Sequence, residues 1–161
     1  MTFFAFGLNH ETASVGVTEA FALDETAQRI LYAELDLDSS AEVILLSTCN
    51  RTEAYLYGTL DDVERVQQAL AAEAGQDWPE EEAFFCRDEA AVRHVLEVTS
   101  GLRSMVLGDA QILAQVKEAY RRAVDADAVN TLLHRLMHTA FRAAKRVASE
   151  TAISSGAASV S

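Results

Sequence analysis

The residues best suited to chemistry in this chain are consecutive: positions 47–51 read Ser-Thr-Cys-Asn-Arg. They stand between an apolar run at positions 43–46 and a strand-like run at positions 53–57. A cysteine thiolate is a nucleophile, and a nearby guanidinium favours the thiolate over the thiol when the site is partly exposed. The segment therefore predicts a reactive thiol at Cys49, assisted by Arg51. The alternative for an isolated cysteine is a small buried apolar residue.

The second cysteine and one histidine are the next candidates for chemistry. Cys86 follows two phenylalanines, which favours a core residue without a chemical role. His94 shares a helical face with Ala91, Val95 and Val98. Patterning alone leaves it either a buried core histidine or a catalytic group near the thiol. Two cysteines are too few for a disulfide framework or a zinc site, and the sequence predicts no bound metal.

Composition indicates a folded domain and not a disordered or membrane-spanning chain. Half of the 161 residues are hydrophobic and 24% are charged, which is typical of a globular protein. No apolar run approaches the roughly 18 residues of a membrane helix. The first residues, Met-Thr-Phe-Phe-Ala-Phe, lack a basic lead and predict a strand, not a signal peptide. With so few cysteines, a reducing cytoplasm is the simplest compartment.

Charge is distributed unevenly along the chain. The formal net charge is -12, which would repel nucleic acid if it were spread evenly over the surface. Arg135, Arg142 and Lys145 recur at helical spacing late in the sequence, opposite the apolar positions of the same segment. Two interpretations of this basic stripe stay open: a solvated helix face, or a contact with a phosphate backbone.

The elements that must hold these residues follow from periodicity. We expect a strand over residues 3–8 and then a helix that is capped by Asp24 and runs to about residue 35. One strand follows on each side of Cys49. A helix from about residue 59 and a final or edge strand at 83–86 complete this part. This order predicts an α/β fold of the ferredoxin-like βαββαβ sandwich type. Beyond it the pattern is wholly helical, with helices capped by Asp88 and Asp109 and a last helix over about 130–152.

Four segments, in order, resemble the N-terminal catalytic domain of glutamyl-tRNA reductase. They are GLNHETA at residues 7–13, LSTCNRTE at 46–53, SGLRSMVLG at 100–108 and QILAQVK at 111–117. The resemblance implies a catalytic domain over residues 1–152, with the sandwich at 1–87 and the helices at 88–152. Residues 153–161 would then begin a linker helix to a further, NADPH-binding domain.

The resemblance also implies a covalent mechanism. The thiolate of Cys49 would attack the glutamyl ester of glutamyl-tRNA, and NADPH would reduce the resulting thioester to glutamate-1-semialdehyde, a precursor of tetrapyrroles (porphyrin and heme). His94 would support the chemistry, and Arg51 would clamp a substrate carboxylate through its guanidinium fork. The positions that the resemblance assigns to glutamate binding are Thr48, Asn50, Arg51, Ser104, Asp109, Gln111 and Gln115. The basic stripe of Arg135, Arg142 and Lys145 becomes a candidate contact for tRNA.

The chain departs from the family pattern in two places and lacks one motif. Asp109-Ala110 stands where the family usually has Glu-Pro, and Arg103 where an acidic residue is common. No G-x-G-x-x-G motif follows a strand, so NADPH is expected to bind in a domain absent from this chain. The chain alone is then expected not to complete the reduction. The resemblance further implies a homodimer formed through a missing C-terminal domain, and handover of the product to glutamate-1-semialdehyde aminomutase.

Two other classes of function stay open on the residues alone. A non-catalytic ferredoxin-like RNA-binding module would explain the sheet and the basic helix, but the exposed aromatic motif with which such sheets stack bases is not evident. A stand-alone cysteine esterase would explain Cys49 and His94. The reactivity of the Cys49 thiol distinguishes these classes, because a binding module does not need a reactive cysteine.

Overall fold

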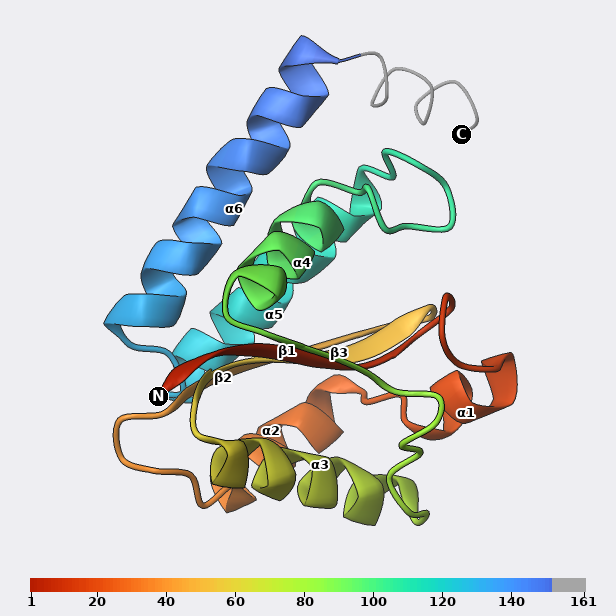
Figure 1. Cartoon of the computed structure of the whole chain (residues 1–161), viewed down its shortest axis with the longest axis vertical. Helices are drawn as coiled ribbons and strands as arrows, with labels where there is room; N and C mark the ends of the chain where they lie inside the picture. Colours follow the sequence, from red (N-terminus) through yellow and green to blue (C-terminus); the bar gives the residue numbers. More distant parts are fainter. Residues whose placement is uncertain (152–161) are drawn as a thin grey trace.

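Four strands and six helices make up residues 1–151, the part of the chain that the computed structural model describes (Figure 1). The strands are β1 (Thr2–Asn9), β2 (Glu42–Thr48), β3 (Arg51–Gly58) and β4 (Phe84–Arg87). The helices are α1 (Val15–Ala20), α2 (Glu25–Glu34), α3 (Leu60–Ala74), α4 (Glu89–Thr99), α5 (Gln111–Asp125) and α6 (Thr131–Glu150). Residue 152 and the expected start of a linker helix at 153–161 lie outside the described residues.

The strands form one antiparallel sheet in the order β2-β3-β1-β4. Helices α2 and α3 cover one face of this sheet (Figure 1). The arrangement is the ferredoxin-like βαββαβ topology, so the predicted fold is confirmed. The sequence pattern does not predict α1, because this helix of six residues buries only Thr18 and gives no apolar period.

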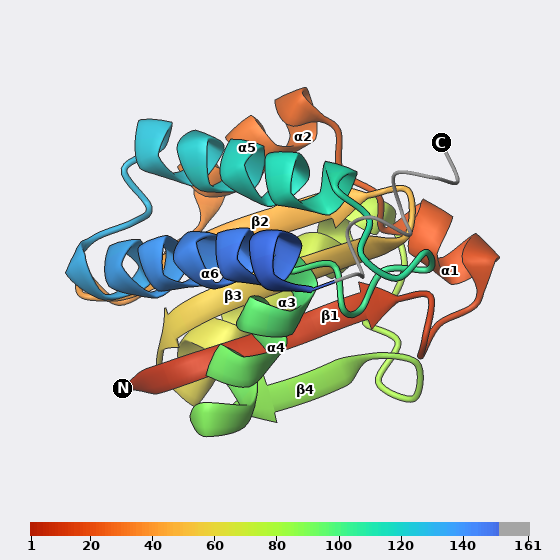
Figure 2. The same cartoon turned by 90° about the horizontal axis from the view of Figure 1, so that it is seen from above.

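The opposite face of the sheet is covered by α4 and α5, and α6 packs on these two helices (Figures 1 and 2). Ile44 and Tyr55 of the sheet share a core with Val95 of α4 and Val116 of α5. From residue 89 to residue 150 the regular elements are all helices. The helices after residue 88 pack on the same sheet as α2 and α3 do, so the two segments of the chain share one sheet.

Both faces of the sheet are apolar because neighbouring residues of a strand point to opposite sides. On β2, Val43 and Leu45 belong to the core beneath α2 and α3, whereas Ile44 and Leu46 belong to the core beneath α4, α5 and α6. This explains the continuous apolar run that precedes the cysteine segment in the sequence. No helix within residues 1–151 is both long enough and apolar enough to cross a membrane.

One of the three predicted helix caps is present as a side-chain hydrogen bond at the N-cap position. Asp24 accepts the N–H of Ala27 through Oδ1 at 2.8 Å, which satisfies a free donor in the first turn of α2. The predicted cap at Asp109 is wrong by one residue: Ala110 occupies the N-cap position of α5 and makes no side-chain cap, although Asp109 just before it accepts the N–H of Gln111 through Oδ1 at 2.9 Å. Asp24 therefore marks the helix start that the sequence indicates.

The predicted cap at Asp88 is wrong. The residue precedes α4, but it has a φ of 55°, and its side chain makes no capping hydrogen bond to the helix. Its carboxylate instead accepts hydrogen bonds from the Thr2 hydroxyl and the Arg87 guanidinium. Asp88 thus ties the start of β1 to the turn between β4 and α4.

The start of α6 is capped by a residue from a different element. Asn130 makes no side-chain cap. Glu42, 3% exposed in β2, accepts the N–H groups of Asn130 at 2.6 Å and Leu133 at 2.9 Å through Oε1, and that of Leu132 at 3.2 Å through Oε2. A carboxylate at a helix N-terminus satisfies free N–H donors and complements the helix dipole. Glu42 therefore fixes α6 to the sheet.

Candidate active site

Cys49 lies at the tip of the hairpin between β2 and β3. Thr48 pairs with Arg51, so Cys49 and Asn50 are the two loop residues. The N–H of Asn50 donates to the Thr48 hydroxyl at 3.2 Å, and the carbonyl of Asn50 accepts the N–H of His10 at 3.0 Å. The hairpin is thereby held from within and from the end of β1, while the Cys49 thiol is exposed.

Close packing of β1 against β3 supports the same region. Gly7 pairs with Glu53 and has a φ of 146°, which L side chains rarely adopt. A Cβ atom at this position would lie 2.3 Å from the carbonyl oxygen of Thr52 and 2.7 Å from Cα of Glu53. Only glycine fits there, so the glycine of the first family-like segment allows β1 to approach the strand that follows Cys49.

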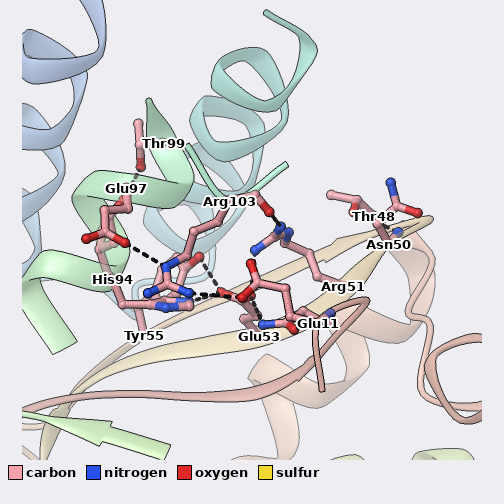
Figure 3. Close-up of polar contacts among 12 residues, drawn as sticks. Glu11, Thr48, Asn50, Arg51, Glu53, Tyr55, His94, Glu97, Thr99 and Arg103 are labelled. Carbon is pink, nitrogen blue, oxygen red and sulfur yellow. Dashed lines mark hydrogen bonds and ion pairs between the residues drawn. The ribbon is translucent and has the colours of Figure 1, made fainter. Parts of the chain in front are cut away.

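The inward face of β3 places three polar side chains side by side. Arg51, Glu53 and Tyr55 alternate along the strand and point toward α4, which carries His94 (Figure 3). Glu53 is fully buried at the centre. Its Oε1 accepts hydrogen bonds from Arg51 Nη1 at 2.8 Å and Asn9 Nδ2 at 3.4 Å. Its Oε2 accepts from the Tyr55 hydroxyl and from His94 Nε2, both at 2.8 Å.

Electrostatics keep the central carboxylate ionised. Burial raises the pKa of Glu53, but the hydrogen bond and attraction from His94, the Arg51 guanidinium and the Tyr55 hydroxyl outweigh burial and lower this pKa below its ordinary value. For Tyr55, burial and the adjacent Glu53 carboxylate raise the pKa well above its usual range. Tyr55 therefore stays protonated and donates, and Glu53 stays negative and accepts.

His94 is thus a buried histidine with a specific polar partner. Its side chain is 3% exposed, and its ring lies against Phe84 with 4.5 Å between ring centroids. The bond from Nε2 to Glu53 fixes the orientation of the imidazole. The sequence left a core histidine and a catalytic histidine as alternatives; the structure places His94 in the core and in the polar network at once.

The structure places Arg51 differently from an open carboxylate clamp. The side chain is 2% exposed. Nη1 is used by Glu53, and Nη2 donates to the backbone carbonyl of Arg103 at 2.6 Å. Because a buried guanidinium requires partners nearby, both contacts stabilise it. In this structure Arg51 connects β3 to the loop after α4, and a substrate carboxylate would have to compete with Glu53 for it.

That loop, residues 101–108, is closed at its base by glycines. Gly101 and Gly108 have φ values of 79° and 78°, and the N–H of Gly108 donates to the Gly101 carbonyl at 3.1 Å. The Arg103 side chain pairs with Glu97 at 2.7 Å and with Glu11 at 3.2 Å. The loop is therefore anchored to α4, to the residues after β1 and, through its carbonyl, to Arg51.

The remaining predicted glutamate-binding residues lie along this loop and the start of α5. Ser104 directly follows the residue whose carbonyl binds Arg51, and it is half-buried. Asp109 also lines a cavity of about 80 Å³ between the loop and α6. Gln111 and Gln115 are exposed in the first two turns of α5. The structure brings Ser104 next to the buried network and leaves the two glutamines at the surface.

A larger cavity lies beside His94. It has a volume of about 390 Å³ and is lined by Cys86, Glu89, Ala90, Arg93, His94 and Arg103. Burial raises the pKa of the Cys86 thiol, which keeps it protonated and a poor nucleophile. The basic groups that border this cavity already pair with carboxylates: Arg93 with Glu89, Arg103 with Glu97 and Glu11, and His94 with Glu53. Among residues 1–151, no three His, Cys, Asp or Glu side chains are grouped to hold a metal ion.

The candidate tRNA contacts form a separate surface. Arg135, Arg142 and Lys145 are exposed on α6, as their spacing predicts. The apolar side of the same helix buries Leu133 and Met137 among its core residues.

Sequence reasoning assigned no role to Glu53, although it ends the segment that resembles the family. The available signal was the alternation of Arg51, Glu53 and Tyr55 in a strand flanked by apolar strands, which places a charged pair on a buried face. The hydrogen bond from Arg51 to the carbonyl of Arg103 has no local signal in the sequence, because 52 positions separate the two residues.

Known proteins match the chain over almost its whole length. Residues 6–151 match the family model described as glutamyl-tRNAGlu reductase, N-terminal domain. A glutamyl-tRNA reductase of Salinibacter ruber is 62% identical over 161 residues, covering 100% of this chain and 34% of that protein. One of Oleidesulfovibrio alaskensis is 46% identical, covering 98% of this chain and 36% of that protein.

A solved structure gives the same answer for the fold. Glutamyl-tRNA reductase from Methanopyrus kandleri matches with a TM-score of 0.77 and 31% sequence identity, covering 93% of this chain and 35% of the solved chain. The present chain thus spans 34% to 36% of these relatives. The chain belongs to the glutamyl-tRNA reductase family, in which it corresponds to the N-terminal domain.

Proposed function

We propose that this chain takes the glutamyl group from glutamyl-tRNA onto Cys49 as a thioester. The observation that carries the proposal is the position of Cys49: an exposed thiol on a two-residue turn, two positions from a buried guanidinium in a fixed polar network. Membership of the family supplies the substrate, since relatives along the whole chain are named glutamyl-tRNA reductases.

The proposed step is an acyl transfer in which one bond replaces another. The Cys49 thiolate attacks the carbonyl carbon of the glutamyl ester and forms a C–S bond. The C–O bond to the terminal ribose breaks, and the ribose oxygen leaves as a hydroxyl after taking a proton. Glu53 and His94 act as positioning residues, because they hold Arg51 and the start of β3 in place beneath the turn.

The residues described here do not fit the NADPH that the family name implies. A dinucleotide site of the common type needs a glycine-rich turn between a strand and a helix of a parallel sheet. Within residues 1–151 the sheet is antiparallel throughout, and no G-x-G-x-x-G motif occurs in the sequence. Reduction to glutamate-1-semialdehyde, and with it a role in tetrapyrrole synthesis, is therefore proposed for the longer proteins, with NADPH held outside this chain.

The proposal is tested by incubation with tRNA carrying labelled glutamate. Wild type is expected to retain a protein-bound label that a small thiol releases, whereas Cys49→Ser should retain none. Cys86→Ser is the matched control, because its thiol is half-buried and protonated, and it should label like wild type. Equal labelling of wild type and Cys49→Ser would refute the thioester.

A second function follows from the exposure of the thiol. Water can reach a thioester at an exposed turn, so in the absence of reduction the chain would release free glutamate slowly and behave as an esterase. The same incubation measures this activity as labelled glutamate in solution. A Cys49 that alkylates no faster than a free thiol and takes up no label would favour the RNA-binding module instead.

A further inference from the structure

Four aromatic side chains form one cluster between α5 and α6, which run side by side (Figure 2). Tyr120 comes from α5, and His134, His138 and Phe141 come from successive turns of α6. Tyr120 contacts all three rings, with centroids at 5.9, 5.8 and 5.7 Å. The two histidine rings are 4.3 Å apart. We call these four residues the aromatic platform.

One side of the aromatic platform packs against the core, and the other side is exposed to solvent. Tyr120 and Phe141 are half-buried and pack against the core, whereas His134 and His138 are exposed. Burial raises the pKa of Tyr120, and the Tyr120 hydroxyl shares a hydrogen bond with Nδ1 of His134. Rings fixed in this way lose little conformational entropy when another flat group stacks on them.

Positive charge surrounds the platform. Lys117 lies 5.8 Å from the centroid of the Phe141 ring. Four basic residues lie in α6, namely Arg135, Arg142, Lys145 and Arg146, and the helix contains a single acid, Glu150, as its last residue. Within residues 1–151, ion pairs are formed by Arg146 but not by Arg135, Arg142 or Lys145. In a chain with a net charge of -12, this is a local reversal of charge.

We infer that the aromatic platform stacks an unpaired base of the tRNA while the neighbouring basic residues of α6 contact its phosphates. The inference rests on the proposed function, which supplies the RNA. Single-stranded RNA is recognised by aromatic and histidine rings that stack its bases beside cations that track its backbone. At helical spacing, His134, His138, Phe141 and Lys145 lie on one side of α6, and Arg135 and Arg142 lie next to that side. The platform and the stripe are therefore continuous.

RNA suits this surface better than an apolar protein partner does. The exposed members are imidazole rings and cations, whereas Leu133 and Leu136 of α6 are buried and Leu132 and Val147 are half-buried. A hydrophobic docking surface requires a contiguous exposed aliphatic or aromatic patch of low charge. Alternating rings and cations are the composition used to bind nucleic acid.

The test compares binding of tRNAGlu without its amino acid across a series of salt concentrations. The double variant His134→Ala/His138→Ala should weaken binding about tenfold with an unchanged salt dependence, because stacking is lost and no phosphate contact is removed. Arg142→Glu/Lys145→Glu should weaken binding and also flatten the salt dependence. His138→Phe keeps an aromatic ring and should bind like wild type. Gln68→Ala, exposed on α3 at the opposite face of the sheet, is the control.

Two readouts separate this inference from the thioester proposal. Acylation of Cys49 by a small activated glutamyl ester should be unaffected by any platform variant, because this donor carries no RNA.

If wild type is acylated by glutamyl-tRNA but His134→Ala/His138→Ala binds tRNA as tightly as wild type, the platform is overturned and the thioester stands. If Cys49 is acylated by neither donor, the thioester fails; the binding data then decide on the platform alone. Thermal unfolding of each variant checks that a loss of binding is not a loss of folding.

Discussion

The carboxylate of Glu53 joins side chains from three elements: Asn9 at the end of β1, Arg51 and Tyr55 on β3, and His94 on α4. Removing one partner from a buried charge pair is costly, because the other charge is left without compensation in a medium of low polarity. Glu53 therefore stabilises the fold and the position of the cysteine turn at the same time. Its role is to position Arg51 and His94.

Replacement of this carboxylate has a predicted effect on stability. Glu53→Gln should reduce the free energy of unfolding at neutral pH by about 3 kcal/mol, since it leaves the Arg51 guanidinium buried without a counter-charge. Glu97→Gln is the matched control, because its pair with Arg103 is partly exposed, and it should cost less than about 1 kcal/mol. Urea unfolding measures both values. Equal losses in the two variants would contradict a special role for Glu53.

The same carboxylate gives a pH dependence with a defined sign. The pKa of Glu53 is lower in the folded than in the unfolded protein, so folding favours the ionised form. Its contribution is therefore complete above the unfolded pKa of about 4.3 and is lost as the pH falls through the lower folded value. The difference in stability between wild type and Glu53→Gln should shrink over this acidic range. A difference that stays constant from neutral pH to about pH 3 would exclude the linkage.

At the scale of elements, contacts between distant segments fix the helical layer to the sheet. Glu42 in β2 accepts three N–H groups at the start of α6, a helix of 20 residues that carries the aromatic platform. The loop at 101–108 is tied in the same way, through Arg51 and the ion pairs of Arg103. Each connection joins a functional surface to the sheet through a buried or partly buried charge.

Loss of the Glu42 cap should loosen α6. Glu42→Ala leaves three buried or half-buried N–H groups without an acceptor and should destabilise the protein by about 2 kcal/mol. Hydrogen exchange should show faster opening of the first turn of α6 than of α3, which keeps its own cap at Thr59. Glu34→Ala, at an exposed position, should change stability by less than about 0.5 kcal/mol. Unchanged exchange in α6 would argue against the cap.

In the whole molecule, one sheet separates two helical layers, each with its own apolar core. α2 and α3 cover one face and belong to its apolar core, whereas α4, α5 and α6 on the other face carry His94, the glutamine pair and the basic stripe (Figure 1). The antiparallel sheet leaves no place for the glycine-rich turn of a dinucleotide site within residues 1–151. We therefore expect residues 1–151 to carry out acyl transfer without reduction.

This separation predicts the behaviour of the chain with NADPH. The chain incubated with glutamyl-tRNA and NADPH should become acylated at Cys49 but should not oxidise NADPH, because its residues do not fit the dinucleotide. Absorbance of NADPH measures oxidation, and a full-length relative such as the Salinibacter ruber protein serves as the positive control. Formation of semialdehyde by the chain alone would disprove the separation.

Reasoning from the sequence alone predicts the ferredoxin-like topology, the start of α2 and the two strands on either side of Cys49. These features are encoded locally, because strand and helix periods and helix caps depend on residues within about one turn of each other. Local geometry also explains two of the errors in the elements. α1 is too short to show a period, and the backbone at Asp88 turns its carboxylate away from α4.

Contacts between residues far apart in the sequence assemble the site. His94 and Glu53 are 41 positions apart, Arg51 and Arg103 are 52 apart, and Glu42 and Asn130 are 88 apart. No local pattern encodes such pairs; they form because packing removes charged groups from water, and a buried charge is stable only beside a partner. The sequence could therefore point to Cys49, but packing determined that Arg51 beside it is a buried connector and that Glu53 holds it in place.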